Sequence, residues 1–119
     1  MVYLNEFSPH RKVTCLRLRP DRRGTLRGIA SILIDDIGLE IRKVTIHQQR
    51  DKRWALLPAR PKLDQKSIAI RDHRGKIAYE ALLAIPEDTR RAEFSSSVVN
   101  AVAMFAPTAF EPEMVEVLS

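Results

Sequence analysis

Three residue types that enzyme sites commonly use are scarce in this sequence. The one cysteine, Cys15, has no partner for an internal disulfide or a two-cysteine metal motif. Four scattered glycines are too few for a glycine-rich phosphate loop. The three histidines, His10, His47 and His73, lack the spacing of metal ligands. We therefore expect no enzyme activity, no metal, no cofactor and no small-molecule substrate.

Long apolar runs are missing as well. No stretch approaches the roughly 20 apolar residues that span a bilayer, and the N-terminal MVYLNEFSPHRK lacks the apolar stretch of a signal peptide. With 119 residues, of which 45% are hydrophobic, the chain is long and apolar enough for one folded domain. A single cysteine suits a reducing compartment. We expect a cytoplasmic protein without a membrane partner.

Other groups resemble catalytic ones in composition only. Asp35 and Asp36 are adjacent, and adjacent residues of a strand point to opposite faces, so their carboxylates do not converge. Turn aspartates are common because their side chains bond to nearby backbone. The serines at 95–97 lie in a predicted helix without a nucleophile-elbow context. Cys15 lies in a predicted strand, where a buried structural thiol is the simplest interpretation.

Charge is distributed unevenly along the chain. Residues 1–76 hold 18 Lys and Arg against 8 Asp and Glu, whereas residues 77–119 hold 2 against 7. The net charge is +5 and the pI is about 9.8. A basic surface attracts phosphate backbones through counterion release, without reading their sequence. This charge indicates a nucleic-acid partner, although basic charge also serves solubility alone.

Alternation of apolar and polar residues predicts four strands, at 13–19, 27–34, 39–47 and 54–58. In the first strand, strict alternation places Leu16 and Leu18 on one face and Cys15 on the other. The second strand has apolar residues on both faces, as a central strand does. The third strand breaks its own alternation, and a bulge near Arg42 and Lys43 would restore a single apolar face.

Turn residues separate these strands. Pro20, Asp21 and Gly24 predict a turn over 20–24. A hairpin is predicted from SIAIR and KIAYEALLAI, which flank DHRG with Gly75 in the turn. The outer end of this hairpin is polar and basic, so we expect an arm that reaches into solvent. We find no internal repeat in the sequence.

After Pro86 the apolar period changes from two to about 3.6, which predicts a helix that ends at Pro107. Asp88 or Thr89 can cap the start of this helix. Its apolar stripe comprises Phe94, Val98, Ala101, Val102 and Phe105. We expect a single domain over residues 1–107 and an acidic tail over residues 108–119 that is either flexible or docked on a partner.

These elements together predict an α+β fold: an antiparallel sheet of about five to six strands with a protruding hairpin and one C-terminal helix. One helix covers only one face of a sheet that has two apolar faces. The uncovered face predicts self-association, most simply as a twofold homodimer.

The candidate nucleic-acid-binding residues are the cations at the first turn, the bulge, the hairpin tip and the helix start. Cations at a helix start oppose the helix dipole, at a cost of about 0.3–1 kcal/mol when exposed, which favours an external role for them. Aromatic residues are few, and Trp54, Tyr3 and Tyr79 are the candidates for base stacking, with a core position as the alternative for Trp54. Binding is therefore expected to be dominated by phosphate contacts. The candidate residues are Arg17, Arg19, Arg22, Arg23, Arg27, Arg42, Lys43, Arg71, Arg74, Arg90 and Arg91.

One pattern resembles a known family. The stretch VTCLRLRPDRRGTLRGIASILIDD, followed by LEIRKVTI and WALLPARP, resembles the N-terminal half of the SpoVG family of septation and sporulation regulators. The matching residues are Arg27, Ile29, Ala30, Ser31, Ile32, Asp35, Ile41, Val44, Leu56, Pro58 and Arg60. The resemblance implies a small dimeric α+β protein that binds DNA and RNA and regulates transcription. The stretch 61–85 is longer than the family pattern, and Arg90 and Arg91 match its basic helix start loosely.

Two hypotheses of different class follow. The first is a regulatory, homodimeric nucleic-acid-binding protein with weak sequence selectivity. The second is a protein–protein interaction module, whose sheet face, hairpin arm or tail docks on a protein while the charge confers solubility. Affinity for nucleic acid that falls steeply with salt favours the first, and a protein complex that survives nuclease and high salt favours the second.

Overall fold

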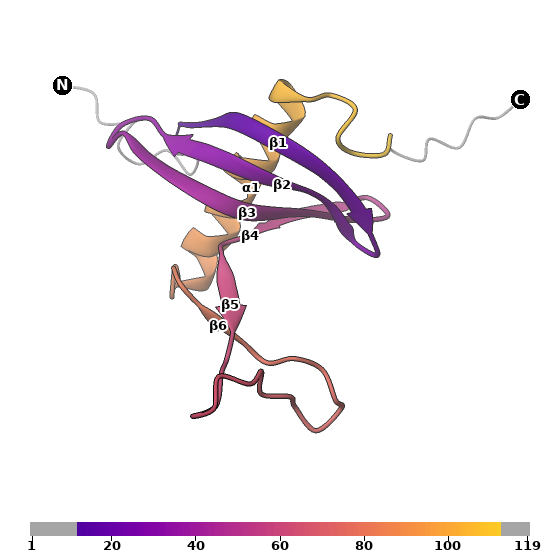
Figure 1. Ribbon diagram of the computed structural model, residues 1–119. Helices are drawn as coiled ribbons and strands as arrows, with labels where there is room; N and C mark the ends of the chain where they lie inside the picture. Colours follow the sequence, from indigo (N-terminus) through magenta and orange to yellow (C-terminus); the bar gives the residue numbers. More distant parts are fainter. Residues whose placement is uncertain (1–11, 113–119) are drawn as a thin grey trace, which may run out of the picture.

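The protein has an α+β fold with a four-stranded antiparallel sheet, a separate two-stranded sheet and one C-terminal helix. The computed structural model describes residues 12–112. In chain order the elements are β1 (Val13–Arg23), β2 (Leu26–Ile34), β3 (Leu39–Gln49), β4 (Lys52–Leu56), β5 (Ala59–Pro61), β6 (Tyr79–Ala81) and α1 (Asp88–Phe105) (Figure 1). The predicted α+β class is confirmed, but the six strands form two sheets where one was expected. Within the described residues, no helix has the length and apolar character needed to cross a membrane.

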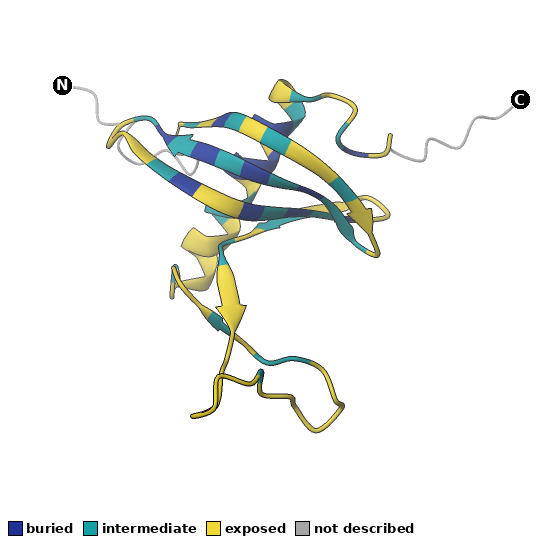
Figure 2. Ribbon diagram, in the orientation of Figure 1, coloured by how far each residue is buried: buried dark blue, intermediate teal, exposed yellow. Residues whose placement is uncertain are grey.

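The four-stranded sheet has the order β1-β2-β3-β4, and α1 lies across one of its faces (Figure 1). Side chains of a strand alternate between faces. In β2, Ala30, Ile32 and Ile34 are buried in the core beneath the helix, whereas Ile29 and Leu33 on the opposite face are half-buried (Figure 2). We call this opposite face the open face. The fully buried residues of the core are Ile32, Val44, Ile46, Val98 and Val102.

Two bulges set which side chains reach the core. The predicted bulge at Arg42 and Lys43 is confirmed: the register of β2 and β3 shifts there, and Lys43 has a φ of 60°. A second shift, between Cys15 and Arg17 of β1, was not predicted. Because of it, Cys15 and Leu18 pair with core-facing residues of β2, so the expected strict alternation in this strand is wrong.

The first turn is shorter than the sequence predicts. β1 continues through Pro20 and Asp21 to Arg23, so the expected turn over 20–24 is wrong. The connection to β2 consists of Gly24, with a φ of 55°, and Thr25. A proline is tolerated in β1 because this is an edge strand, paired only with β2.

Residues 59–81 form an arm that projects from the sheet (Figure 1). β5 and β6 are its stem, and three chain segments meet beyond them in a cycle of backbone hydrogen bonds. The amide of Lys62 donates to the carbonyl of Ala78 at 2.8 Å, Ala78 donates to Ile70 at 2.8 Å, and Ile70 donates back to Lys62 at 2.9 Å. The predicted hairpin is therefore confirmed only around its DHRG turn, because residues 79–81 pair with β5.

Two lobes of the arm repeat one turn geometry, eight residues apart. Asp64 Oδ1 accepts hydrogen bonds from the amides two and four residues further on, at 2.8 and 3.0 Å. Asp72 Oδ1 does the same, also at 2.8 and 3.0 Å. The residue three after each aspartate has a left-handed backbone, with a φ of 62° at Ser67 and 79° at Gly75. The two turns thus share a local geometry that the sequence analysis did not identify.

The helix begins at Asp88, one residue earlier than a side-chain cap at Asp88 would require and two earlier than a cap at Thr89 would require. Glu87 is the N-cap residue and makes no side-chain cap hydrogen bond, so the predicted cap is wrong. Of the predicted stripe, Val98, Ala101 and Val102 are buried and Phe94 packs against the core, but Phe105 is 51% exposed.

The segment after the helix belongs to the core. Phe110 is 4% exposed and Ala109 packs against the same core, although both lie in the stretch predicted to be an acidic tail. The side chain of the buried Gln48 binds this segment through both of its polar atoms: Nε2 donates to the carbonyl of Glu111 at 3.1 Å, and Oε1 accepts from its amide at 2.8 Å. The rest of the predicted tail, residues 113–119, lies outside the described residues.

Candidate nucleic-acid interface

Most of the predicted arginines on the sheet have a carboxylate partner. Arg17 and Arg42 both bind Glu40, at 2.5 and 3.1 Å. Arg23 binds Asp21 through two hydrogen bonds of 2.9 and 2.8 Å. Hydrogen bonds from Arg42 lower the pKa of Glu40, and those from Arg23 lower the pKa of Asp21. These arginines present little net charge to an external phosphate.

Arg22 and Arg27 hold the C-terminal segment. Arg22 donates to the carbonyl oxygens of Thr108 and Ala109 at 3.2 and 3.3 Å. Both arginines lie near the same oxygen of Glu111, at 3.5 and 3.4 Å. The side chain of Arg27 is only 12% exposed and donates hydrogen bonds to the backbone carbonyls of Gly24 and Leu26. Arg27 therefore has a structural role.

The two arginines of the helix start are paired as well. Arg90 lies 3.1 Å from Glu87, and Arg91 binds Asp88. Arg91 also donates to the carbonyl of Ile85 at 3.0 Å, which ties the helix to the preceding segment. The expected conflict with the helix dipole is thus offset by local carboxylates. The ion-pair partners of Arg90 and Arg91 lie at the start of the helix and not on the sheet.

The cations of the arm differ from those of the sheet and the helix in their partners. Among the residues that the structure describes, its five outer cations form no ion pair with a carboxylate, whereas Arg60 of its stem binds Glu80 at 2.6 Å. The carboxylates of Asp64 and Asp72 each accept backbone amides of their own lobe through Oδ1 and form no ion pair with these cations in the described chain. The five cations are Lys62, Lys66, Arg71, Arg74 and Lys76. The structure therefore brings Arg71 and Arg74 together with three lysines that were not in the predicted set.

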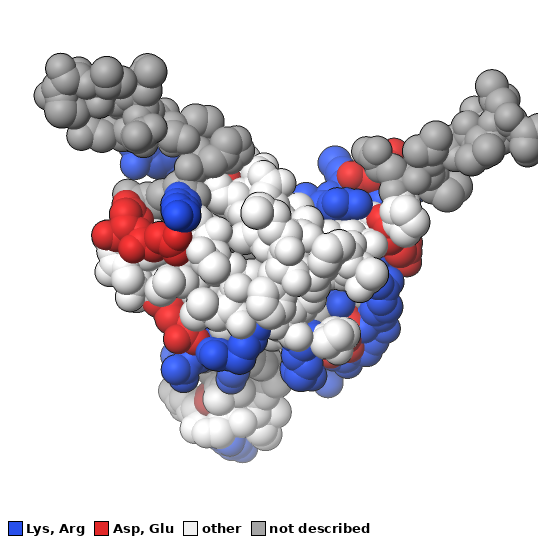
Figure 3. All heavy atoms as spheres, turned by 90° about the horizontal axis from the view of Figure 1, so that it is seen from above, with Lys and Arg blue, Asp and Glu red and all other residues white. Residues whose placement is uncertain are grey.

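On the sheet, Arg19 and Lys43 are the predicted residues without an ion pair in the described part of the chain. Arg19 pairs across the strands with Ile29 and lies on the open face. Lys43 is exposed at the bulge. Viewed from above, acidic side chains lie among the basic ones along the rim, around a wide uncharged area (Figure 3). The described side chains on this side form no continuous basic face.

The turn between β3 and β4 adds cations that the predicted set omits. Arg50 and Lys52 are exposed at this turn. Arg53 donates to the carbonyl of Glu111 at 3.2 Å, and its guanidinium lies 4.6 Å from the centre of the Phe110 ring. The position of Arg50, Lys52 and Arg53 directly before Trp54 was visible in the sequence. Only the structure shows that this tryptophan lies outside the core.

Trp54 and His47 form an aromatic pair on the open face. Their rings are stacked with centres 5.5 Å apart and planes 8° from parallel. The ring nitrogens of His47 lie 3.0 Å from the hydroxyls of Thr25 and Thr45. Burial lowers the pKa of His47, and the charge of Arg27 lowers it further. The imidazole is therefore held neutral and in one orientation at neutral pH.

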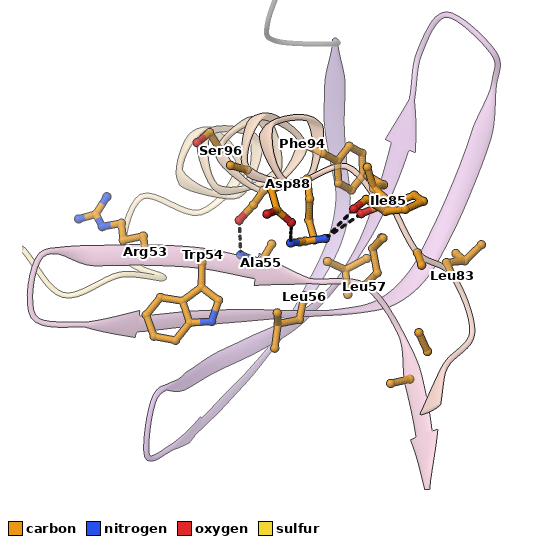
Figure 4. A pocket seen from close by; sticks show the side chains of 18 residues that line it. Arg53, Trp54, Ala55, Leu56, Leu57, Leu83, Ile85, Asp88, Phe94 and Ser96 are labelled. Atoms are coloured by element: carbon orange, nitrogen blue, oxygen red, sulfur yellow. Dashed lines mark hydrogen bonds and ion pairs between the residues drawn. The ribbon is translucent and has the colours of Figure 1, made fainter. Parts of the chain in front are cut away.

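A groove of about 720 Å³ lies between α1, β4 and residues 81–86 (Figure 4). Its lining is mostly apolar and includes Leu57, Leu83 and Phe94. The hydroxyl of Ser95 accepts a hydrogen bond of 2.8 Å from the amide of Ala55, which satisfies an outward backbone group of the edge strand β4. In this view Trp54 and Leu56 point away from the helix, toward the open face (Figure 4).

Two of the groups considered for catalysis or metal binding, Asp35 and Cys15, have structural surroundings. The hydroxyl of Thr14 donates to Asp35 Oδ1 at 3.0 Å, so this carboxylate has a structural partner. Cys15 is 5% exposed, and burial raises the pKa of its thiol. Over residues 12–112, no three His, Cys, Asp or Glu side chains come together where they could hold a metal ion.

The chain has no match among protein-family models, curated proteins or solved structures. The resemblance to the SpoVG family stays a prediction.

Proposed function

We propose that this protein binds nucleic acid through phosphate contacts, as a small regulatory protein without catalytic activity. The observation that carries the proposal is the arm, because five cations project there without a carboxylate partner in the described chain. An unpaired surface cation near a phosphate releases a counterion and gains affinity. A cation that already has a carboxylate partner gains less, since the partner must be given up.

The arm favours affinity for phosphate over sequence selectivity. Lys66 and Arg74 occupy equivalent positions in the two lobes, and the backbone amide of each is bound by the aspartate of its lobe. Both residues are exposed, so their side chains are available to solvent. Contacts of this kind position a protein on a nucleic acid but do not distinguish bases. DNA or RNA fits this proposal, in line with the SpoVG-like pattern of the sheet strands.

We further propose a homodimer, formed through the open face. Ile29 and Leu33 lie in the centre of this face and are half-buried, and no element among residues 12–112 covers them. Apolar surface of this kind usually marks an interaction site. Light scattering of the wild type and of Leu33→Glu tests it: the variant should have half the mass of the wild type, whereas equal masses contradict this interface.

The experiment for the function is a binding titration over a range of salt concentrations, with single-stranded DNA, duplex DNA and RNA. Binding through the five arm cations predicts that the logarithm of the association constant falls linearly with the logarithm of the salt concentration, by about 0.7–0.9 per phosphate contacted. An absence of binding to all three nucleic acids at low salt contradicts the proposal.

A second candidate is a protein-interaction module, which the apolar residues of the arm favour. Leu63, Ile68 and Tyr79 are 56%, 58% and 59% exposed. Exposed apolar side chains on a projecting element are typical of a protein-docking surface. A protein that is captured by the chain from lysate, after nuclease treatment and in high salt, and that is lost with Ile68→Asp would support this alternative.

A further inference from the structure

The stacked pair of Trp54 and His47 ends at a free edge of the sheet. The two residues are cross-strand partners, with His47 on β3 and Trp54 on β4. Among the strands that the structure describes, none lies beside the outer edge of β4, because the sheet has the order β1-β2-β3-β4. The face of the indole that points away from His47 therefore has no cross-strand neighbour. A planar group could continue the stack there.

This edge is rigid on its inner side. The imidazole of His47 is held between the hydroxyls of Thr25 and Thr45, each 3.0 Å from a ring nitrogen. A fixed ring beneath the indole limits the freedom of the indole, so less entropy is lost when a ligand stacks on it. Leu56 lies two residues further along the same face and is 51% exposed, which extends the apolar surface beside the indole.

Charge beside the indole suits a phosphate. Arg50 and Lys52 lie in the turn directly before it, and neither forms an ion pair in the described part of the chain. Arg53 is fixed against Phe110 and Glu111. An aromatic ring with adjacent exposed cations is the combination by which proteins bind single-stranded nucleic acid, since the ring stacks on a base and the cations contact the backbone.

We propose that the outer face of Trp54 receives an unstacked nucleobase, so that the preferred ligand is single-stranded nucleic acid with its backbone along the cations of the β3–β4 turn. This inference rests on the proposed function. It gives the protein a second contact region for nucleic acid besides the arm. It also predicts that the protein prefers single strands over duplexes. Between its two ends a duplex offers no base face to Trp54 without unstacking, whereas a single strand offers one at every unstacked base.

The test uses the full chain and the emission of Trp54, which is the only tryptophan in the sequence. The probes are an oligothymidylate of about ten nucleotides, a duplex of equal length, and inorganic polyphosphate. We expect the oligothymidylate to quench the emission at saturation, and the duplex and the polyphosphate to bind with little quenching. Equal quenching by polyphosphate contradicts stacking.

Variants make the result independent of fluorescence. Trp54→Leu should weaken binding of the oligothymidylate by about 5- to 150-fold and leave duplex binding unchanged, because one stacked base is lost. Trp54→Phe keeps an aromatic ring and should retain most of the affinity for the oligothymidylate. This variant tests the stacking site if Trp54→Leu does not fold. The matched control is Phe105→Leu at the end of α1, whose ring is 51% exposed and lies outside the arm and the β3–β4 turn, and whose loss should change affinity less than twofold.

The outcomes separate this inference from the function on which it rests. Oligothymidylate binding without quenching, together with unchanged affinity in both Trp54 variants, overturns the stacking site and leaves the phosphate-binding function in place. Failure of every nucleic acid to bind at low salt overturns both.

Discussion

The sheet and the arm use their charged residues in opposite ways. On the sheet, carboxylates take up the arginines: Glu40 binds two of them and Asp21 binds a third. On the arm, the backbone takes up the carboxylates, because Asp64 and Asp72 bind amides of their own turns. The arm cations are thereby left for an external partner. A count of basic residues along the chain does not show this difference, because it becomes visible only when the interaction partner of each charged side chain is known.

The two regions also differ in what holds them together. The sheet and helix bury a common core, in which Ile32, Val44 and Val98 have no exposed surface. The arm has three backbone hydrogen bonds in a cycle and two side-chain-bonded turns, and its large apolar residues are mostly exposed. The stability of the fold should therefore depend on the body, and the function on the arm.

The largest expected effect separates the stability of the two regions. Ile32→Ala should lower the free energy of unfolding by about 2–5 kcal/mol, because it leaves a cavity in the core. Ile68→Ala, at a residue 58% exposed on the arm, should change it by less than about 0.5 kcal/mol. Urea denaturation measures both. Comparable losses for the two variants would show that the arm is part of the cooperative core.

A glycine in each region sharpens the same comparison. At Gly28 an added Cβ would lie 2.8 Å from Leu18 Cδ1 and 3.1 Å from the carbonyl oxygen of Arg19, so Gly28→Ala should destabilise the body by about 1–3 kcal/mol. Gly75→Ala meets no atom within 4 Å, and its φ of 79° strains only the outer lobe. Thermal unfolding should show a lower Tm for the first variant only. A matching loss of Tm in Gly75→Ala contradicts an independent arm.

Removal of a sheet carboxylate should make the sheet resemble the arm. Glu40→Gln leaves Arg17 and Arg42 without their shared partner. We expect binding of duplex DNA to become several-fold tighter at low salt, and its salt slope to become steeper by up to about two. Glu93→Gln is the control for net charge, because Glu93 has no ion pair among the described residues. Identical gains in the two variants would show that local pairing has no effect.

The smallest expected effect is a pH dependence on the open face. Burial, followed by the charge of Arg27, lowers the pKa of His47 in the folded protein, so the unfolded chain binds more protons between the folded pKa and the ordinary value of about 6.5. The contribution of His47 to stability is full above that ordinary value and is lost as the pH falls toward the folded pKa. Titration by NMR should give a folded pKa below 6.5. A value above it contradicts the buried, neutral imidazole.

Local signals in the sequence were sufficient for much of the fold. The broken alternation of β3 predicted the bulge at Arg42 and Lys43, because apolar residues on both phases leave few other solutions. The bulge after Cys15 gave no such signal, since Leu16 is apolar and fits either face. The first turn was misplaced because proline and aspartate favour turns in general but are also accepted in an edge strand.

The candidate site was harder to predict, because it depends on contacts between distant residues. Arg17 and Glu40 are 23 positions apart and meet only through the register of three strands. Gln48 and Glu111 are 63 positions apart, and nothing in the periodicity indicates that the tail closes the core there. The lobes of the arm were partly visible, since an aspartate precedes a basic residue by two positions in each, at Asp64 and Asp72.

The most direct test of the central claim compares salt slopes between the two regions. The arm variant is Lys66→Ala with Arg74→Ala, and the matched body variant is Arg23→Ala with Arg42→Ala, which removes two arginines that have carboxylate partners. Both lose two positive charges. The slope of duplex DNA binding against salt should become shallower by about two in the arm variant and change little in the body variant. Equal changes, or a larger change in the body variant, would contradict the claim that the arm makes the phosphate contacts.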